Sequence, residues 1–151
     1  MMRVTVNVDG LKELDRALRG LKASTAKSVA RRVLMKAGEP IAEAGRAQAP
    51  LGPTGNLKAS YGVGTKLTRR QSKLAKKEND VEVYIGPNDP AAIQTEFGNE
   101  HQAPEPHLRP AWDAGKDRAL EDIKTGLWAE ISKAVARLAR KADRLARKAQ
   151  G

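Results

Sequence analysis

The sequence predicts an α+β fold, with a small, mostly antiparallel sheet packed against N-terminal helices and followed by a long amphipathic C-terminal helix. Two kinds of apolar spacing support this. Alternation at strand period occurs at 3–8, 57–65 and 81–85, and three- and four-residue spacing typical of helices occurs at 11–21, 25–44 and 110–149. The 151 residues are expected to form one domain, with 1–109 as an α+β body and 110–151 as a long helix ending in a basic extension.

The N-terminal quarter is expected to contain one strand and two helices. Val4, Val6 and Val8 alternate with polar residues over Arg3–Val8, and Asp9 is placed to cap a helix that ends near Gly20. Ser24 or Thr25 would cap a second helix, whose apolar face comprises Val29, Val33, Ala37, Ile41 and Ala44. Pro40 lacks a backbone donor, so we expect a kink or break near Glu39.

The middle of the chain is expected to form a hairpin with a long basic loop. Proline and glycine are dense between Ala49 and Gly55, which predicts a loop. Alternating residues then predict strands at 57–65 and 81–85, joined by a mobile loop over 66–77. The segment Ala91–Phe97 is interpreted as a short strand, or mixed structure, stopped by Gly98 with Phe97 in the core.

The C-terminal helix has the strongest periodic pattern in the chain. Pro110 suits its first turn, because that position needs no backbone N–H. A straight helix from Pro110 to Ala149 would be roughly 60 Å long, whereas a compact domain of this size is about 30 Å across. The helix must therefore either kink near Gly126 or dock its distal half on another subunit.

The net charge of +10 is concentrated in two segments. Six bases and no acid lie between Lys66 and Lys77, and six bases with a single acid lie between Arg137 and Lys148. Each segment is a candidate contact for DNA or for an acidic partner, although a solvated surface is an equally good interpretation. The candidate residues are Lys66, Arg69, Arg70, Lys73, Lys76, Lys77, Arg140, Lys141, Arg144, Arg147 and Lys148.

The sequence offers little support for catalysis. It has no cysteine, and its two histidines, His101 and His107, do not have a recognised metal-ligand spacing. Ser60, His107 and Asp113 could be drawn as a catalytic triad, but no nucleophile motif surrounds the serine. We expect no enzyme activity, no cofactor and no metal. No apolar run reaches the roughly 20 residues that span a bilayer, so no membrane partner is expected.

Four short motifs in order resemble the small head–tail joining, or tail-completion, protein family of long-tailed bacteriophages and related prophages. They are Ala49-Pro50, Thr54-Gly55-Asn56-Leu57-Lys58-Ala59-Ser60, Glu96-Phe97-Gly98 and Pro106-His107-Leu108-Arg109-Pro110-Ala111. The resemblance covers roughly Leu11 to Ile131. His107 stands where the family usually has an aromatic residue, and the basic extension after about Ala134 is longer than the family pattern.

The resemblance implies a non-enzymatic virion protein of the neck or tail that forms a ring oligomer, hexameric or a multiple of six, around the DNA channel. It would be assembled in the bacterial host cytoplasm, with connector or stopper, tail terminator and tail tube proteins as partners. The candidate interface residues are Thr54, Gly55, Leu57, Glu96, Phe97, Gly98, Leu108, Arg109, Pro110, Trp112, Leu127, Ile131, Leu138 and Leu145.

Two alternatives stay open. One is a basic nucleic-acid-binding module of a mobile element, which would bind DNA through the two basic segments with a steep salt dependence. The other is a tail terminator that caps the tail tube.

Overall fold

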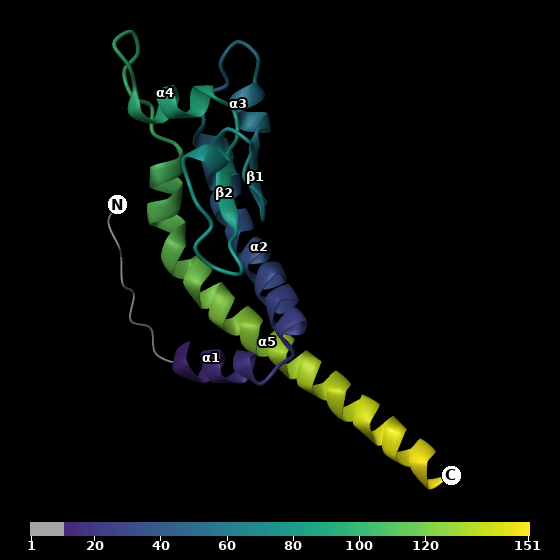
Figure 1. The fold of residues 1–151 in the computed structure, drawn as a ribbon. Coiled ribbons are helices and arrows are strands. Elements are labelled where there is room, and N and C mark those ends of the chain that lie inside the picture. The colour runs from purple at the N-terminus through teal and green to yellow at the C-terminus, as the bar shows by residue number, and fades with distance from the viewer. Residues whose placement is uncertain (1–10) are drawn as a thin grey trace.

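The computed structural model describes residues 11–151, and it has an α+β architecture built on two long antiparallel helices. Helix α2 (Ala23–Gln48) lies along the first half of α5 (Leu108–Gln150), as Figure 1 shows. Helix α1 (Leu11–Arg19) crosses beneath this pair. The predicted strand Arg3–Val8 and the Asp9 cap lie outside the described residues.

Glycines allow the two long helices to pack closely. A Cβ atom at Gly115 of α5 would lie 2.8 Å from Cγ1 of Ile41 on α2, and one at Gly126 would lie 3.0 Å from Cγ1 of Val33. Such distances leave no room for a side chain. The branched residues of α2 therefore fit into positions of α5 that carry only hydrogen, which partly compensates for the scarcity of aromatic residues.

A two-stranded antiparallel sheet packs against the other side of α2. Strand β1 (Tyr61–Gly64) pairs with β2 (Tyr84–Pro87) in the register Tyr61↔Pro87 to Gly64↔Tyr84. Both are shorter than predicted. The first part of the predicted strand 57–65 is instead the short helix α3 (Asn56–Ala59), which begins after Gly55 turns the chain with φ of +70°.

Helix α4 (Ala91–Phe97) replaces the strand predicted for this segment, so that prediction was wrong. Pro90 precedes the helix with φ of −55° and ψ of −31°, values that already suit a helix. Within the helix, Thr95 donates its hydroxyl to the carbonyl oxygen of Ala91 at 2.6 Å. A seven-residue segment is too short for its apolar spacing to distinguish a strand from a helix.

Both long helices are continuous at the residues where the sequence suggested an interruption. Helix α2 continues through Pro40, which lies on its exposed side, where a missing backbone hydrogen bond is cheap. Helix α5 continues through Gly126, because that glycine serves the contact with Val33 rather than a kink. The helix is thus continuous at Gly126, and docking of its distal half on another subunit stays a prediction.

The loop after β1, which we predicted to be mobile, makes several contacts with the body. It contains a 3₁₀ turn, η1 (Gln71–Lys73). Gln71 donates from its side-chain amide to the carbonyl oxygen of Pro87 at 3.3 Å, and Arg70 donates to that of Asn88 at 3.0 Å. Lys27 of α2 lies 3.5 Å from the carboxylate of Asp80. The loop is therefore held at both its ends.

The buried apolar residues form two clusters along α2. The larger joins α1, the N-terminal half of α2 and the middle of α5 through Leu14, Leu21, Val29, Val33, Leu127, Ile131 and Ala134. The smaller one, Ala49, Leu57 and Tyr61 with Leu108 and Ala92 against it, lies where α3, β1, α4 and the start of α5 meet. The second cluster underlies the candidate site.

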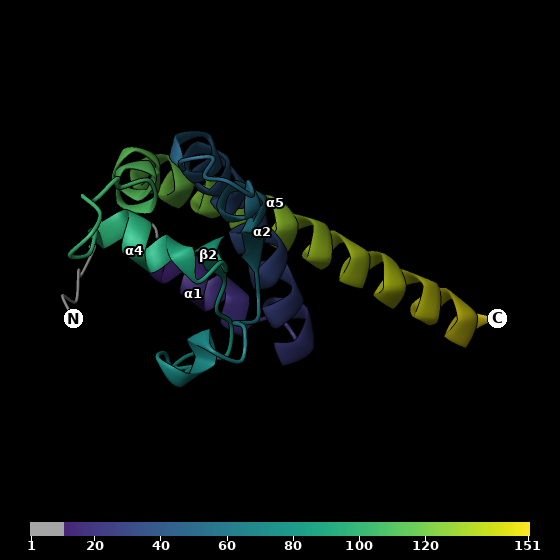
Figure 2. The same cartoon turned by 90° about the horizontal axis from the view of Figure 1, so that it is seen from above.

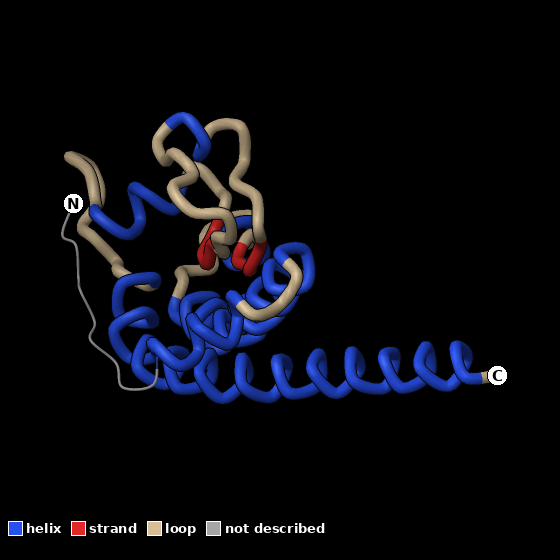
Figure 3. Tube along the Cα trace, turned by 60° about the horizontal axis from the view of Figure 1, so that its bottom comes forward, coloured by secondary structure: helices blue, strands red, loops and turns tan. Residues whose placement is uncertain are grey.

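The distal part of α5 extends beyond the rest of the molecule. Every residue from Val135 to Gly151 is exposed, and Figures 1 and 2 show this segment projecting away from the body. Figure 3 shows the same projection beside the two short strands and the loops. Among the described residues, no helix is long and apolar enough to cross a membrane.

Candidate functional site: the junction of α4 and α5

The carboxylate of Glu96, near the end of α4, caps the start of α5. It accepts hydrogen bonds from the backbone nitrogens of His107, Leu108 and Arg109, each at 2.9 Å. These are the cap residue and the first two residues of the helix. The next residue is Pro110, which has no N–H. One buried side chain therefore satisfies every free backbone donor at this end of α5.

The pKa of Glu96 reflects this arrangement. Glu96 is only 5% exposed, and its burial, the largest single influence, raises the pKa. The hydrogen bonds from the three backbone N–H groups and from the Arg109 side chain together outweigh burial and hold the pKa at about 2. Glu96 is thus ionised at neutral pH, and its negative charge lies at the positive end of the α5 dipole.

Arg109 joins the two helices a second time. Its Nε donates to the Glu96 carboxylate at 3.1 Å, and its Nη2 donates to the Glu96 carbonyl oxygen at 2.9 Å. The guanidinium also lies 4.6 Å from the centre of the Phe97 ring. We predicted that Phe97 lies in the core, and this was wrong: the residue is 61% exposed. It is held on the surface by Arg109.

Gly98 makes the turn out of α4 possible. Its φ of +74° is strained for any residue with a side chain, and a Cβ there would lie 2.8 Å from the backbone nitrogen of Pro104. The proline loop returns from this point, and Glu105 donates its N–H to the carbonyl oxygen of Thr95 at 2.7 Å. The Glu-Phe-Gly motif thus combines a cap, a surface aromatic and a tight turn.

His107 is a buried anchor beneath the junction. It is 0% exposed, and its Nδ1 is hydrogen-bonded to the hydroxyl of Tyr61, whose ring packs edge-on at a centroid distance of 5.6 Å. If the tyrosine donates, the imidazole proton is on Nε2, which lies 3.6 Å from the Glu96 carboxylate and has no hydrogen-bond partner. His107 therefore occupies the family's aromatic position as a buried ring.

Burial dominates the pKa values of this pair. It lowers the pKa of His107, although the nearby charge of Glu96 acts in the opposite direction. It also raises the pKa of the Tyr61 hydroxyl, and here Glu96 adds to the effect. Both groups are consequently neutral at pH 7. Because Tyr61 and His107 are both buried, they are positioned for packing rather than for contact with a substrate.

The structure does not assemble the catalytic triad that can be drawn from the sequence. The hydroxyl of Ser60 donates to the carbonyl oxygen of Leu57 at 2.8 Å and accepts from the backbone nitrogen of Asp89 at 3.2 Å. His107 faces Tyr61 instead. Within residues 11–151, no three His, Asp or Glu side chains are grouped as a metal site.

The remaining motifs meet the junction from the other side. Gly55 supplies the left-handed turn before α3, Leu57 is buried beside Tyr61, and Ser60 ties α3 to the chain after β2. Lys58 donates to the carbonyl oxygen of Ala47 near the end of α2 at 3.3 Å. The four ordered motifs therefore converge on one junction, which the sequence order alone does not reveal.

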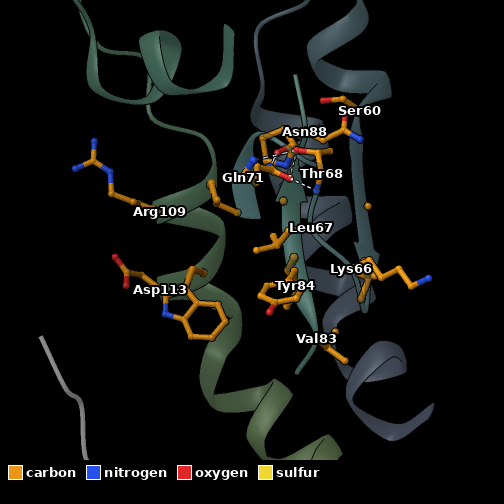
Figure 4. A pocket seen from close by; sticks show the side chains of 18 residues that line it. Ser60, Lys66, Leu67, Thr68, Gln71, Val83, Tyr84, Asn88, Arg109 and Asp113 are labelled. Atoms are coloured by element: carbon orange, nitrogen blue, oxygen red, sulfur yellow. Dashed lines mark hydrogen bonds between the residues drawn. The ribbon is translucent and has the colours of Figure 1, made fainter. Parts of the chain in front are cut away.

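A groove opens beside the junction, with a volume of about 720 Å³. In Figure 4, Arg109 and Asp113 border it from α5, while Thr68, Gln71 and Tyr84 border it from the hairpin and its loop. Leu108 and Trp112 add apolar surface on the α5 side, and Trp112 is exposed. The start of α5 thus contributes to both the buried junction and an open surface.

The other predicted interface residues are divided between core and surface. Leu127 and Ile131 are buried within the chain against α1 and α2, so they are core residues here. Leu138 and Leu145 are exposed, together with Val135. Thr54 and Pro110 are also exposed.

Neither basic segment is neutralised within the chain. Among the described residues, none of the six bases of the 66–77 loop and none of the six bases of distal α5 forms an ion pair, whereas bases elsewhere, such as Arg32 with Glu130 at 2.8 Å, do. Of the loop bases, Lys66 lines the groove, while the bases of distal α5 lie on the projecting helix.

These features define a structural junction: ionisable groups are buried to fix two helices, and apolar and basic surfaces are left open on either side. A protein-family model described as "Bacteriophage HK97-gp10, putative tail-component" matches residues 12–98, which is more than half of the chain. The chain belongs to this HK97-gp10-like family of phage tail components, and this confirms the resemblance to phage tail proteins. Neither the curated proteins nor the solved structures include a match.

The structural roles of Glu96 and Tyr61 were not predicted from the sequence. Glu96 caps a helix that begins 12 residues later, so no local capping pattern could identify it. Tyr61 lies 46 residues from His107. The order of the four motifs indicated that they are related, but it did not indicate which contacts join them in the fold.

Proposed function

We propose that this protein is a non-enzymatic virion component of the phage neck or tail, completing the tail or joining it to the head as a ring oligomer around the DNA channel. Its family of phage tail components supports a structural tail role and a place in the virion. The ring and the head–tail position are our inference. Assembly in the host cytoplasm, with connector or stopper, terminator and tube proteins as partners, belongs to the same proposal.

One observation carries the ring proposal, namely the uncovered apolar stripe of distal α5. Val135, Leu138 and Leu145 are 53%, 55% and 58% exposed, in line with buried Leu127, Ile131 and Ala134. The same stripe is thus core in its first part and bare in its second. Bare apolar surface on a projecting helix is unfavourable in water, and a neighbouring subunit would cover it.

The junction supports the proposal by fixing where the stripe points. Glu96 and Arg109 set the start of α5 relative to α4, and the continuous 43-residue helix connects this start to the distal stripe. The exposed Phe97 and Trp112 lie at the opposite end of the helix from the bare stripe. A subunit with apolar surfaces at its two ends can form head-to-tail contacts, which give a ring when the rotation between neighbouring subunits closes.

The test is the mass of the full chain at micromolar concentration, measured by light scattering and native mass spectrometry. We expect a closed oligomer of six subunits or a multiple of six. A double variant, Leu138→Gln with Leu145→Gln, should dissociate it, whereas the matched control Ala136→Gln, off the stripe on the same helix, should not. A strict monomer that also fails to assemble with neck and tail proteins would contradict the proposal.

The alternative of a tail terminator is a second assignment within the same structural class. It predicts binding to the end of an assembled tail tube with no affinity for a connector. Pull-down against tubes and connectors separately distinguishes the two roles.

A further inference from the structure

The six bases of distal α5 all lie on one side of the helix. At about 100° per residue, they fall within an arc of roughly 120°, and Val135, Leu138, Ala142, Leu145 and Ala149 fall within a separate arc of roughly 80°. Asp143 lies outside the basic arc. The basic residues are Arg137, Arg140, Lys141, Arg144, Arg147 and Lys148. We call this side the basic face.

The basic face has no ion-pair partner among the described residues, and its like charges destabilise the isolated helix. All six side chains are exposed, and in the described part of the chain none forms an ion pair. Like charges recur at three- and four-residue spacing, for example Arg140 with Arg144 and Arg144 with Lys148, which destabilises a helix in water. Anions bound along this face would relieve the repulsion.

We infer that the basic face binds the phosphate backbone of double-stranded DNA, an inference that rests on the proposed place of the protein around a DNA channel. The basic arc contains no apolar residue, whereas a protein-binding surface has an apolar centre depleted in charge. Long cations alone, repeated every three to four residues, suit sequence-independent contact with phosphates.

The two faces of distal α5 thus have different partners. The apolar face is left for a neighbouring subunit, and the basic face, separated from it around the helix, stays accessible while that contact is made. The basic loop 66–77 differs, because its bases follow an irregular path and its Arg70 is engaged with the backbone of Asn88. The inference therefore assigns DNA contact to the helix and not to the loop.

The test measures binding of the full chain to a labelled 24-base-pair duplex of arbitrary sequence, by fluorescence anisotropy from 50 to 200 mM salt. If all six bases contact phosphates, the affinity should fall about a thousandfold over this range. The helix-face variant Arg140→Gln, Arg144→Gln and Arg147→Gln should reduce the slope of log affinity against log salt by about 2.7. The loop variant Lys66→Gln, Lys73→Gln and Lys76→Gln removes the same charge and should leave the slope unchanged.

Three results would overturn the inference. The first is the absence of DNA binding at 50 mM salt. The second is an equal reduction of the salt slope in the helix-face and loop variants. The third is that poly-glutamate of the same total charge competes as well as unlabelled duplex does. Poly-glutamate carries about one charge per 3.3 Å against one per 1.7 Å in DNA, so it should compete at least about tenfold more weakly. Equal competition would indicate an acidic protein partner.

The same samples separate this inference from the proposed function. Circular dichroism confirms that each variant keeps its helix, and light scattering gives its assembly state. The helix-face variant should assemble like the wild type, because its apolar face is intact. The inference is supported if only the helix-face variant loses DNA binding and it still assembles normally. A monomeric wild type that binds DNA through this face would contradict the ring and leave the DNA contact standing.

Discussion

The carboxylate of Glu96 accepts two hydrogen bonds from Arg109, one from its backbone nitrogen at 2.9 Å and one from its Nε at 3.1 Å. Arg109 donates a third hydrogen bond, from Nη2 to the Glu96 carbonyl oxygen at 2.9 Å. Arg109 lies 13 positions after Glu96 in the chain. Because these bonds join the end of α4 to the first turn of α5, they fix the angle at which the long helix leaves the body.

Glu96→Gln should lower the free energy of unfolding by about 3 kcal/mol at pH 7. This is the energy that corresponds to the difference between the ordinary carboxyl pKa of 4.5 and the pKa of about 2 in the folded protein. Urea denaturation measures it. The control Glu105→Gln removes an exposed acid next to the same loop and should change stability by less than about 0.5 kcal/mol.

The stability provided by Glu96 should disappear in acid. A carboxyl whose pKa is lowered by folding stabilises the folded state above its unfolded pKa, and this contribution is lost as the pH falls from about 4.5 to about 2. Glu82 also has a pKa lowered to about 2, by its hydrogen bond with Tyr84 and by backbone N–H groups, so the wild type alone is ambiguous. The difference between wild type and Glu96→Gln isolates the junction, and it should shrink towards pH 2.

As the pH falls, protonation of His107 should lower the free energy of unfolding at a higher pH than protonation of Glu96 does. Burial lowers its pKa in the folded protein, so the unfolded chain binds the proton first as the pH drops below 6.5. The wild type should thus be less stable at pH 5.5 than at pH 7.5, and His107→Phe should not show this loss. If both proteins lose the same stability between the two pH values, His107 is not responsible.

The Tyr61–His107 hydrogen bond should appear as coupling between two substitutions. His107→Phe alone leaves the buried tyrosine hydroxyl without a partner, at a cost of about 1–3 kcal/mol. Adding Tyr61→Phe removes that hydroxyl and should recover part of the cost. Unfolding energies of the two single variants and the double variant, measured at pH 7.5, test this. Strictly additive effects would mean that the bond contributes nothing.

Gly45→Ala should be destabilising, by about 1–3 kcal/mol. A Cβ atom at Gly45 would lie 2.5 Å from Cε1 of Tyr61, whose ring is buried and hydrogen-bonded to His107, so we expect the ring to move little. Gly62→Ala is the matched control, because a Cβ there has no neighbour within 4 Å. Thermal unfolding of the two variants should differ clearly. Similar melting temperatures would show that Tyr61 can adjust.

Phe97→Ala should impair assembly more than folding. The ring is mostly exposed and contacts Arg109 within the chain, so its removal should cost no more than about 1 kcal/mol of stability. If Phe97 is an interface residue, the mass of the oligomer should decrease. Arg109→Ala should affect both properties, because its guanidinium also binds Glu96. Normal assembly of Phe97→Ala would remove this residue from the interface.

The fold was predicted from the sequence in its long elements and less well in its short ones. The apolar spacing of Val29, Val33, Ala37 and Ile41 and the stripe of α5 are repeated over many turns, and both helices were found. The segment Ala91–Phe97 has too few residues to reveal a period, and its helical state depends on where Pro90 and Gly98 place its ends. The break considered near Pro40 is absent, and α5 is continuous through Gly126, which was one of two alternatives, because tertiary contacts and exposure, not local preference, decide what such residues do.

The sequence by itself determined the long helices, the α+β class, the two basic segments and the membership of a phage tail family that four ordered motifs indicated. Only the tertiary structure decided what the motifs do. Glu96 caps a helix from outside it, His107 is buried under Tyr61, and Phe97 lies on the surface. The physical reason is that helix periodicity depends on residues close together in the sequence, whereas caps and close contacts pair atoms that only folding brings together.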